Sequence, residues 1–243
     1  MPADQTATHA PRRVAVRTAA AFAVAFALTI TLGWLLELGW ASDGSTKVDS
    51  KITDWFVDHR TPTWTDLMRA ITSLGSSAVV IPIAGMAVVA LLVGHRRWLA
   101  LFVAFAVCGA SLLSVLTKYV IGRDRPPLDL HLQQPHGSAF PSGHSTQAAA
   151  TYFAFAIVVT VLTKSRVLRA AAWVTTTLIV FLVGVSRVYL GVHWTTDVLG
   201  GWFLGSVWVA GLTIALAPLG TRPTSNPLPT GHTPDPTPLP ETS

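Results

Sequence analysis

Apolar side chains occur in long uninterrupted blocks along this chain, with short polar segments between them. Six blocks of 16 to 21 residues contain no Asp, Glu, Lys or Arg, at 18–36, 75–94, 98–117, 145–163, 170–185 and 198–218. An α-helix needs about 20 apolar residues to cross a hydrocarbon core about 30 Å thick. The pattern therefore predicts an all-α, polytopic membrane protein with about six transmembrane helices.

Composition supports the same class of protein. Hydrophobic residues make up 51% of the chain and charged residues 12%, whereas an average soluble domain has about 25% charged residues. This excludes an ordinary soluble enzyme and a disordered chain. The single cysteine, Cys108, lies in an apolar block, so an intramolecular disulfide is excluded and we expect a small buried residue.

Basic residues are concentrated between the apolar blocks. The net charge of +5 and the pI near 9.9 would suggest a nucleic-acid partner for a soluble protein, but here topology explains them. With six crossings, the clusters at 12–17, 95–97 and 164–169 fall on one side, which the positive-inside rule makes cytoplasmic. We therefore expect a multi-pass plasma-membrane protein that binds no nucleic acid.

The domain organisation follows from these spans. Residues 1–17 form a cytoplasmic N-terminal segment, 18–218 a six-helix membrane domain, and 219–243 a proline-rich cytoplasmic tail that we expect to be disordered. The first block follows basic residues, as in a cleaved signal peptide. Its apolar core is longer than the roughly 7–15 residues of such a peptide, so we favour an uncleaved helix.

The outer loop 41–74 contains a second, shorter pattern. Trp64, Leu67, Ile71 and Leu74 recur at helical spacing. An amphipathic helix lying on the membrane surface is the expected structure.

Three clusters that contain Lys, Arg or His lie at the outward ends of the last four blocks. The three clusters are Lys118, Arg125 and Pro126; Pro141, Ser142, Gly143 and His144; and Ser186, Arg187, His193 and Asp197. Any one of them is compatible with an interfacial turn or a cation that reaches the membrane surface. Their coincidence on one face favours a functional site, whereas we interpret Arg123 as an interfacial cation only.

This set is suited to binding an anion. Lys118, Arg125 and Arg187 together match a group with close to two negative charges, and guanidinium groups pair with phosphate oxygens. Ser142 and Gly143 directly precede the fourth block, where the free N–H groups of a helix N-terminus attract anions and glycine allows close approach.

The two histidines can divide the chemistry. His193 and Asp197 are four residues apart, so the carboxylate can accept the Nδ1 proton and leave Nε2 as a nucleophile. His144 would lie near the bound anion and donate a proton to the leaving group. Asp124 and Asp129 are the only carboxylates of their loop, so we expect neither a metal site nor a cofactor.

At these residues the chain resembles the type 2 phosphatidic acid phosphatase superfamily, which comprises lipid phosphate phosphatases related to vanadium haloperoxidases. The family pattern is Lys, six residues, Arg-Pro; then Pro-Ser-Gly-His; then Ser-Arg, five residues, His, three residues, Asp. The three clusters match every position of it.

The resemblance implies a mechanism. His193 would attack phosphorus and form a phosphohistidine, Asp197 would orient it, and His144 would act as general acid and then activate water. Lys118, Arg125, Ser142, Gly143 and Arg187 would hold the phosphate oxygens without a metal.

Family substrates include phosphatidic acid, phosphatidylglycerol phosphate and polyprenyl diphosphates. Our leading hypothesis is hydrolysis of undecaprenyl diphosphate in the outer leaflet. Phosphatidic acid or phosphatidylglycerol phosphate hydrolysis and lipid phosphotransfer are alternatives within the same chemistry. A non-catalytic anion-binding or transport protein is an alternative of another class, but no predicted span carries a charged residue at its centre. The oligomeric state stays open.

Overall fold

A computed structural model describes residues 6–41 and 44–220, which form eight α-helices and one short 3₁₀ turn without a β-strand. The elements in chain order are α1 (Thr6–Ala41), α2 (Gly44–Asp58), α3 (Pro62–Ser73), α4 (Ser77–Val93), α5 (Arg97–Ile121), η1 (Leu128–Leu130), α6 (Gly143–Leu162), α7 (Arg166–Tyr189) and α8 (Thr195–Gly220). The proposed tail falls almost entirely on 221–243, outside the described residues.

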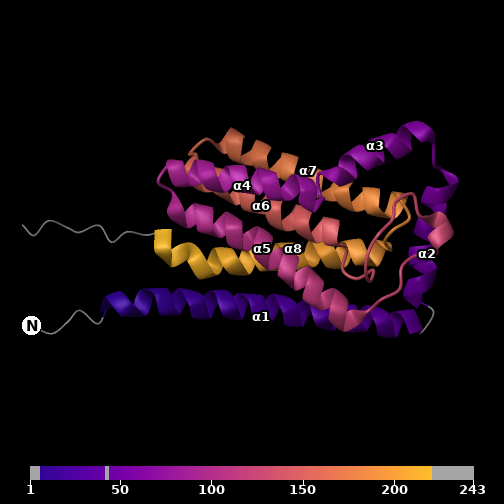
Figure 1. The fold of residues 1–243 in the computed structure, drawn as a ribbon, viewed down its shortest axis with the longest axis horizontal. Helices are drawn as coiled ribbons and strands as arrows, with labels where there is room; N and C mark the ends of the chain where they lie inside the picture. The colour runs from indigo at the N-terminus through magenta and orange to yellow at the C-terminus, as the bar shows by residue number, and fades with distance from the viewer. Residues whose placement is uncertain (1–5, 42–43, 221–243) are drawn as a thin grey trace, which may run out of the picture.

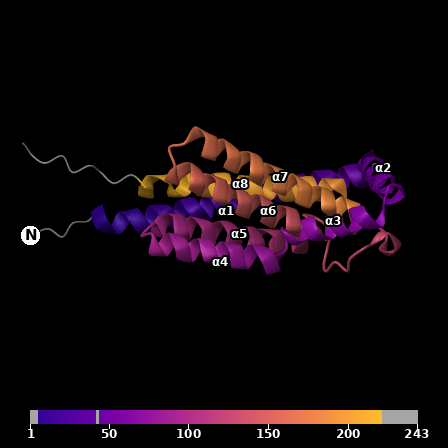
Figure 2. The same ribbon diagram turned by 90° about the horizontal axis from the view of Figure 1, so that it is seen from above.

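The long helices run side by side and form one elongated bundle (Figures 1 and 2). Among the described residues, five helices are long and apolar enough to cross a membrane, and a sixth span results if α3 and α4, which meet at a bend of 41°, are counted together. The prediction of an all-α membrane protein with about six spans is confirmed. The start of α1 and the end of α8 lie at one end of the bundle, while α2 lies at the other (Figure 1).

The first outer loop contains two helices, where the sequence predicted one. The predicted amphipathic helix exists as α3, which begins at the cap residue Thr61, whose side chain accepts a hydrogen bond from the N–H of Trp64. Met68 of α3 is buried and Trp64 is about half exposed. Helix α2 was not predicted, although Val48, Ile52 and Trp55 recur at helical spacing and could have revealed it.

Helix α6 occupies the centre of the bundle and is lined with small residues. Its alanines 148, 149, 150, 154 and 156 are fully buried. Gly201 and Gly205 of α8 pack directly against its backbone, since a Cβ at Gly205 would lie 2.6 Å from the carbonyl oxygen of Thr146. Small residues four apart allow such close helix contacts in membranes, where van der Waals packing holds helices together.

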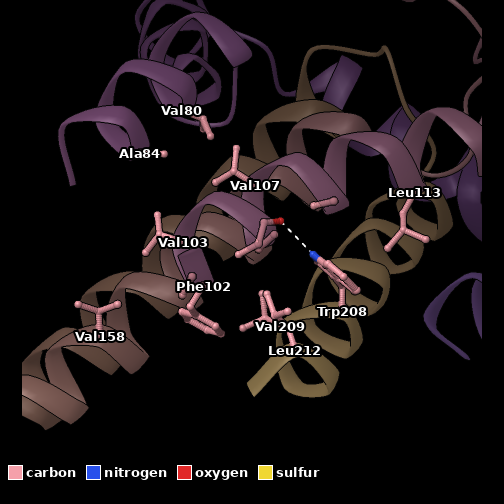
Figure 3. Close-up of a cluster of buried hydrophobic side chains, with 14 of the residues drawn as sticks. Val80, Ala84, Phe102, Val103, Val107, Leu113, Val158, Trp208, Val209 and Leu212 are labelled. Atoms are coloured by element: carbon pink, nitrogen blue, oxygen red, sulfur yellow. Dashed lines mark hydrogen bonds between the residues drawn. The ribbon is translucent and has the colours of Figure 1, made fainter. Parts of the chain in front are cut away.

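Trp208 of α8 illustrates the packing between α8 and α5 (Figure 3). Its ring covers Gly109, where an added Cβ would lie 2.3 Å from the indole. The indole N–H donates to the carbonyl oxygens of Phe105 at 3.2 Å and Ala106 at 3.1 Å. Because the hydrocarbon core offers no water, this internal partner spares the indole an unsatisfied donor.

Cys108 corrects one expectation. It is exposed on the surface of α5 rather than buried. Lipid chains are as apolar as a protein core, so an apolar helix does not reveal by composition which of its faces packs inward.

The contact between α6 and α8 allows a test of the fold. We expect Gly205→Val to lower stability by about 3 kcal/mol, because the new side chain meets backbone atoms of α6. This corresponds to a melting temperature roughly 6–12 °C lower for a chain of this size. Thermal unfolding of the purified protein in detergent measures it. Gly85→Ala is the control, since a Cβ at Gly85 meets nothing within 4 Å; equal melting temperatures for the two variants would contradict this packing.

Candidate active site

The three sequence clusters meet at the end of the bundle that carries α2. Lys118 lies in the last turn of α5, His144 in the first turn of α6, Arg187 in the last turn of α7 and Asp197 in the first turn of α8. Because these four helices alternate in direction, the ends of α5 and α7 lie beside the starts of α6 and α8 (Figure 1). The alternation brings residues almost eighty positions apart to one place.

His193 and Asp197 form a buried pair. The distance from His193 Nδ1 to Asp197 Oδ2 is 3.4 Å, and the same oxygen accepts the N–H of Trp194 at 2.9 Å. A histidine–carboxylate contact of this length is somewhat loose, as is common in ligand-free sites. The turn between α7 and α8 therefore aims the imidazole with Nδ1 toward the carboxylate.

The other ring nitrogen of His193 faces Arg125. Arg125 Nη1 lies 3.2 Å from His193 Nε2. A guanidinium can only donate, so Nε2 must accept and the ring proton must sit on Nδ1. Burial lowers the pKa of His193 well below its usual value, and the charges of Lys118, Arg187 and Arg125 lower the pKa further. The imidazole is thus neutral, with a lone pair on Nε2 at physiological pH.

Three cations lie near His193, since the charges of Lys118, Arg187 and Arg125 all lower its pKa. Lys118 Nζ donates to the carbonyl oxygen of Ser138 at 2.6 Å. Arg125 donates to the carbonyl oxygens of Val192 at 2.6 Å and Gly137 at 2.8 Å. Backbone carbonyls of the 136–139 segment thus hold two phosphate-binding candidates in place, and burial lowers the pKa of Arg125.

Arg187 is the most deeply placed of the three. It is 4% exposed, and its Nη1 donates to Thr72 Oγ1 at 2.9 Å and to Gln133 Oε1 at 2.8 Å. Its buried Nε–H meets no acceptor among the described residues. A buried donor without a partner is costly, and an anion bound between the cations would satisfy it.

The start of α6 completes this group. Gly143 lies against Lys118, since a Cβ there would come 4.0 Å from Lys118 Cε. Ser142 is fully buried; its N–H donates to the carbonyl oxygen of Asp197 at 2.9 Å and its hydroxyl accepts from Ser145 at 3.0 Å. Because the Ser142 side chain does not cap the helix, the first N–H groups of α6 stay available to an anion.

Arg123 corrects a second expectation. It is 4% exposed and bonds to Asp197, rather than reaching out to the membrane interface. It also pairs with Asp49 of α2 and Glu37 of α1. Residue spacing gave no signal for this cluster, because Glu37 and Asp49 lie more than seventy positions before Arg123 in the sequence.

Two further contacts of the site were missed in the sequence. Thr72 of α3 and Gln133 of the α5–α6 connection both bind Arg187. Neither belongs to a recognisable motif, so only the fold reveals them. Among the described residues, no group of three or more His, Cys, Asp or Glu is placed to share a metal ion.

Comparison with known proteins decides the family. The profile of the PAP2 superfamily matches residues 99–219. The chain is 34% identical over 161 residues to the Bacillus subtilis (strain 168) protein named phosphatidylglycerophosphatase B, an alignment that covers 65% of this chain and 77% of that protein. The chain belongs to the PAP2 superfamily.

Two further comparisons support this assignment to the PAP2 superfamily. The protein named undecaprenyl-diphosphatase from Sulfolobus acidocaldarius is 30% identical over 159 residues, covering 63% of this chain and 71% of that protein. The crystal structure of the PAP2 type phosphatidylglycerolphosphate phosphatase from Bacillus subtilis superposes with a TM-score of 0.70 at 27% identity, over 83% of this chain and 98% of that one. The resemblance recognised in the sequence is confirmed, and the chain is a membrane phosphatase.

Proposed function

We propose that this chain hydrolyses the headgroup phosphate of a membrane lipid through a phosphohistidine on His193. The observation that carries the proposal is the environment of His193 Nε2. It is a neutral, unprotonated nitrogen that faces Arg125, with Lys118 and Arg187 close enough to lower its pKa. This places a nucleophile inside a site for a doubly negative group.

The first step forms the phosphoenzyme. Nε2 attacks the terminal phosphorus while the bond from that phosphorus to the leaving oxygen breaks, and His144 donates a proton to that oxygen. The leaving oxygen is the lipid hydroxyl oxygen in a monoester and the bridging oxygen in a diphosphate. Asp197 stabilises the positive charge that develops on His193, because its Oδ2 faces Nδ1. Lys118, Arg125, Arg187 and the first N–H groups of α6 hold the phosphoryl oxygens.

The second step releases phosphate. His144, now deprotonated, takes a proton from a water molecule, which attacks phosphorus and breaks the bond to Nε2. Inorganic phosphate leaves and both histidines return to their starting states. The chain's own cations neutralise the phosphate in this scheme, so we expect turnover to need no metal.

The substrate is proposed as a lipid phosphate or diphosphate. Undecaprenyl diphosphate, favoured from the sequence, has the support of the Sulfolobus relative's name. Phosphatidylglycerol phosphate has the support of the Bacillus relative, which aligns over a larger share of its own length. We therefore place these two lipids first and phosphatidic acid third.

We further propose that the site faces outward from the plasma membrane. The basic clusters at 12–17, 95–97 and 164–169 belong to the bundle end opposite the site, and the positive-inside rule places that end in the cytoplasm. The start of α1 and the end of α8 lie at that same end (Figure 1).

Phosphate release by the purified protein with EDTA present tests the function. We expect release from at least one of undecaprenyl diphosphate, phosphatidylglycerol phosphate and phosphatidic acid in detergent, with one lipid preferred by about tenfold or more in kcat/KM. A parallel reaction with an acceptor lipid distinguishes hydrolysis from phosphotransfer by its products. Failure of well-folded protein to release phosphate from any of the three would refute the proposal.

A further inference from the structure

We propose that Arg123 is a positioning residue for the catalytic pair, and that Asp49 of α2 and Glu37 of α1 complete its support. The inference rests on the proposed function, since it concerns how His193 is held. It adds residues from the first two helices to the active site. Glu37 and Asp49 both precede the segment 99–219 that matches the superfamily profile.

Arg123 fixes the orientation of the Asp197 carboxylate. Its Nη1 donates to Asp197 Oδ1 at 2.8 Å and to Thr196 Oγ1 at 2.7 Å. The side chains of Arg123 and Asp197 are 2% and 0% exposed. With Oδ1 held by Arg123, the carboxylate cannot rotate freely, and Oδ2 stays directed at the N–H of Trp194 and at His193.

Asp49 of α2 binds both Arg123 and Thr196. Its Oδ2 lies 3.2 Å from Arg123 Nη2, and its Oδ1 accepts the N–H of Thr196 at 3.0 Å. Oδ2 also accepts the hydroxyl of Thr196. Thr196 lies in the first turn of α8, where a helix has unpaired N–H groups and attracts negative charge. The Asp49 carboxylate of α2 thus accepts a hydrogen bond from an otherwise unpaired N–H group at the start of α8, the helix that carries Asp197.

Charge explains why the cluster needs all its members. Asp49 and Asp197 are both fully buried, and two buried carboxylates near each other are costly without a cation between them. Arg123 supplies that cation, and Glu37 Oε1 lies 3.2 Å from its Nε. Planar guanidinium is suited to this position because its nitrogens reach three carboxylates in fixed directions, which an ammonium cannot do.

The local sequence explains how Arg123 enters the interior. Gly122 ends α5 with a φ of +68°, a left-handed conformation that glycine adopts without strain. The turn sends Arg123 into the cluster, whereas Tyr119, one turn earlier, is 90% exposed. Arg125, two residues later, then faces His193. One short segment therefore supplies a positioning cation and a phosphate-binding cation.

The kinetic consequence separates Arg123 from the phosphate-binding residues. Arg123 acts through Asp197, so its loss should disturb the aim of His193 and leave the anion site intact. We expect Arg123→Gln to lower kcat by about 10²-fold, the cost of misplacing a reacting group by about 1 Å. KM and the inhibition constant of inorganic phosphate should change by less than about threefold.

Arg123→Lys and Asp49→Asn keep the test decisive if Arg123→Gln does not fold. Lysine retains the charge but not the geometry, so we expect a kcat about tenfold below wild type and partial rescue relative to glutamine. Asp49→Asn preserves shape and should lower kcat by about three- to tenfold with unchanged phosphate inhibition. Arg69→Gln is the control, since Arg69 is exposed and pairs with Asp66 one turn away.

Each outcome has a defined meaning. A kcat that falls while phosphate inhibition is retained supports the positioning role. Folded Arg123→Lys and Asp49→Asn variants with wild-type kcat would overturn it, and so would a loss of phosphate inhibition in proportion to kcat. If wild-type protein releases no phosphate, the proposed function itself fails, which is a separate result.

Discussion

Replacing His193 with alanine is expected to reduce phosphate release by at least about 10⁴-fold, the largest effect of any single substitution in this chain. The variant loses the nitrogen that attacks phosphorus. In the proposed mechanism His144 transfers protons, so it does not take over as the nucleophile. Steady-state phosphate release with EDTA present, using the preferred lipid, measures the effect.

Binding should survive this substitution. The three cations that would hold the phosphate are anchored by other partners, such as Ser138 for Lys118 and Thr72 for Arg187. We therefore expect inorganic phosphate to bind His193→Ala within about threefold of its wild-type affinity. His136→Ala is the matched control, because His136 lies in the neighbouring loop with an exposed side chain and only its carbonyl oxygen meets Arg125. Activity of His193→Ala above about 1% of wild type would refute the nucleophile assignment.

Replacing His144 with alanine is expected to lower kcat for lipid phosphate monoesters, such as phosphatidylglycerol phosphate, by about 10³-fold, within the range for loss of a general acid. The alkoxide of a lipid monoester is a poor leaving group and needs the proton that His144 supplies. An aryl phosphate with an acidic phenol as leaving group does not, so it should still transfer its phosphoryl group to His193.

The second half of the reaction then reveals the other role of His144. Without a base to activate water, the phosphoenzyme formed from the aryl phosphate should persist. We expect a burst of phenol close to one equivalent per protein, followed by turnover about 10²-fold slower than in wild type. Radiolabelled phosphate on the protein, stable to base and labile to acid, would identify phosphohistidine. A variant that turns over aryl phosphate at the wild-type rate would contradict the water-activating role.

The membrane helices could be read from the sequence because the bilayer sets their length. Each of the blocks from 18–36 to 198–218 coincides with a helix of the bundle, and the helix that follows Thr61 was also predicted. The same logic explains the site. Alternating spans necessarily place the ends of α5 and α7 beside the starts of α6 and α8, so motif residues at those ends had to meet.

The interpretations of Cys108 and Arg123 were wrong for two physical reasons. The lipid-facing and inward-facing sides of a membrane helix are equally apolar, so the exposure of Cys108 depends on how α5 packs. A cation near a helix end looks the same whether it faces headgroups or buried carboxylates. Only the approach of α1 and α2 shows that Arg123 meets Glu37, Asp49 and Asp197.

The sequence by itself thus determined the class of fold, the end of the bundle that carries the site and the residues that gather there, because these depend on hydrophobic length and on the order of motifs. The tertiary structure alone decided which hydrogen-bond partner each group has. It showed that Arg125 contacts Nε2 of His193, that Gln133 and Thr72 bind Arg187, and that Asp49 of α2 binds Thr196 beside Asp197. Such contacts join residues tens of positions apart and depend on packing, which no local periodicity or spacing records.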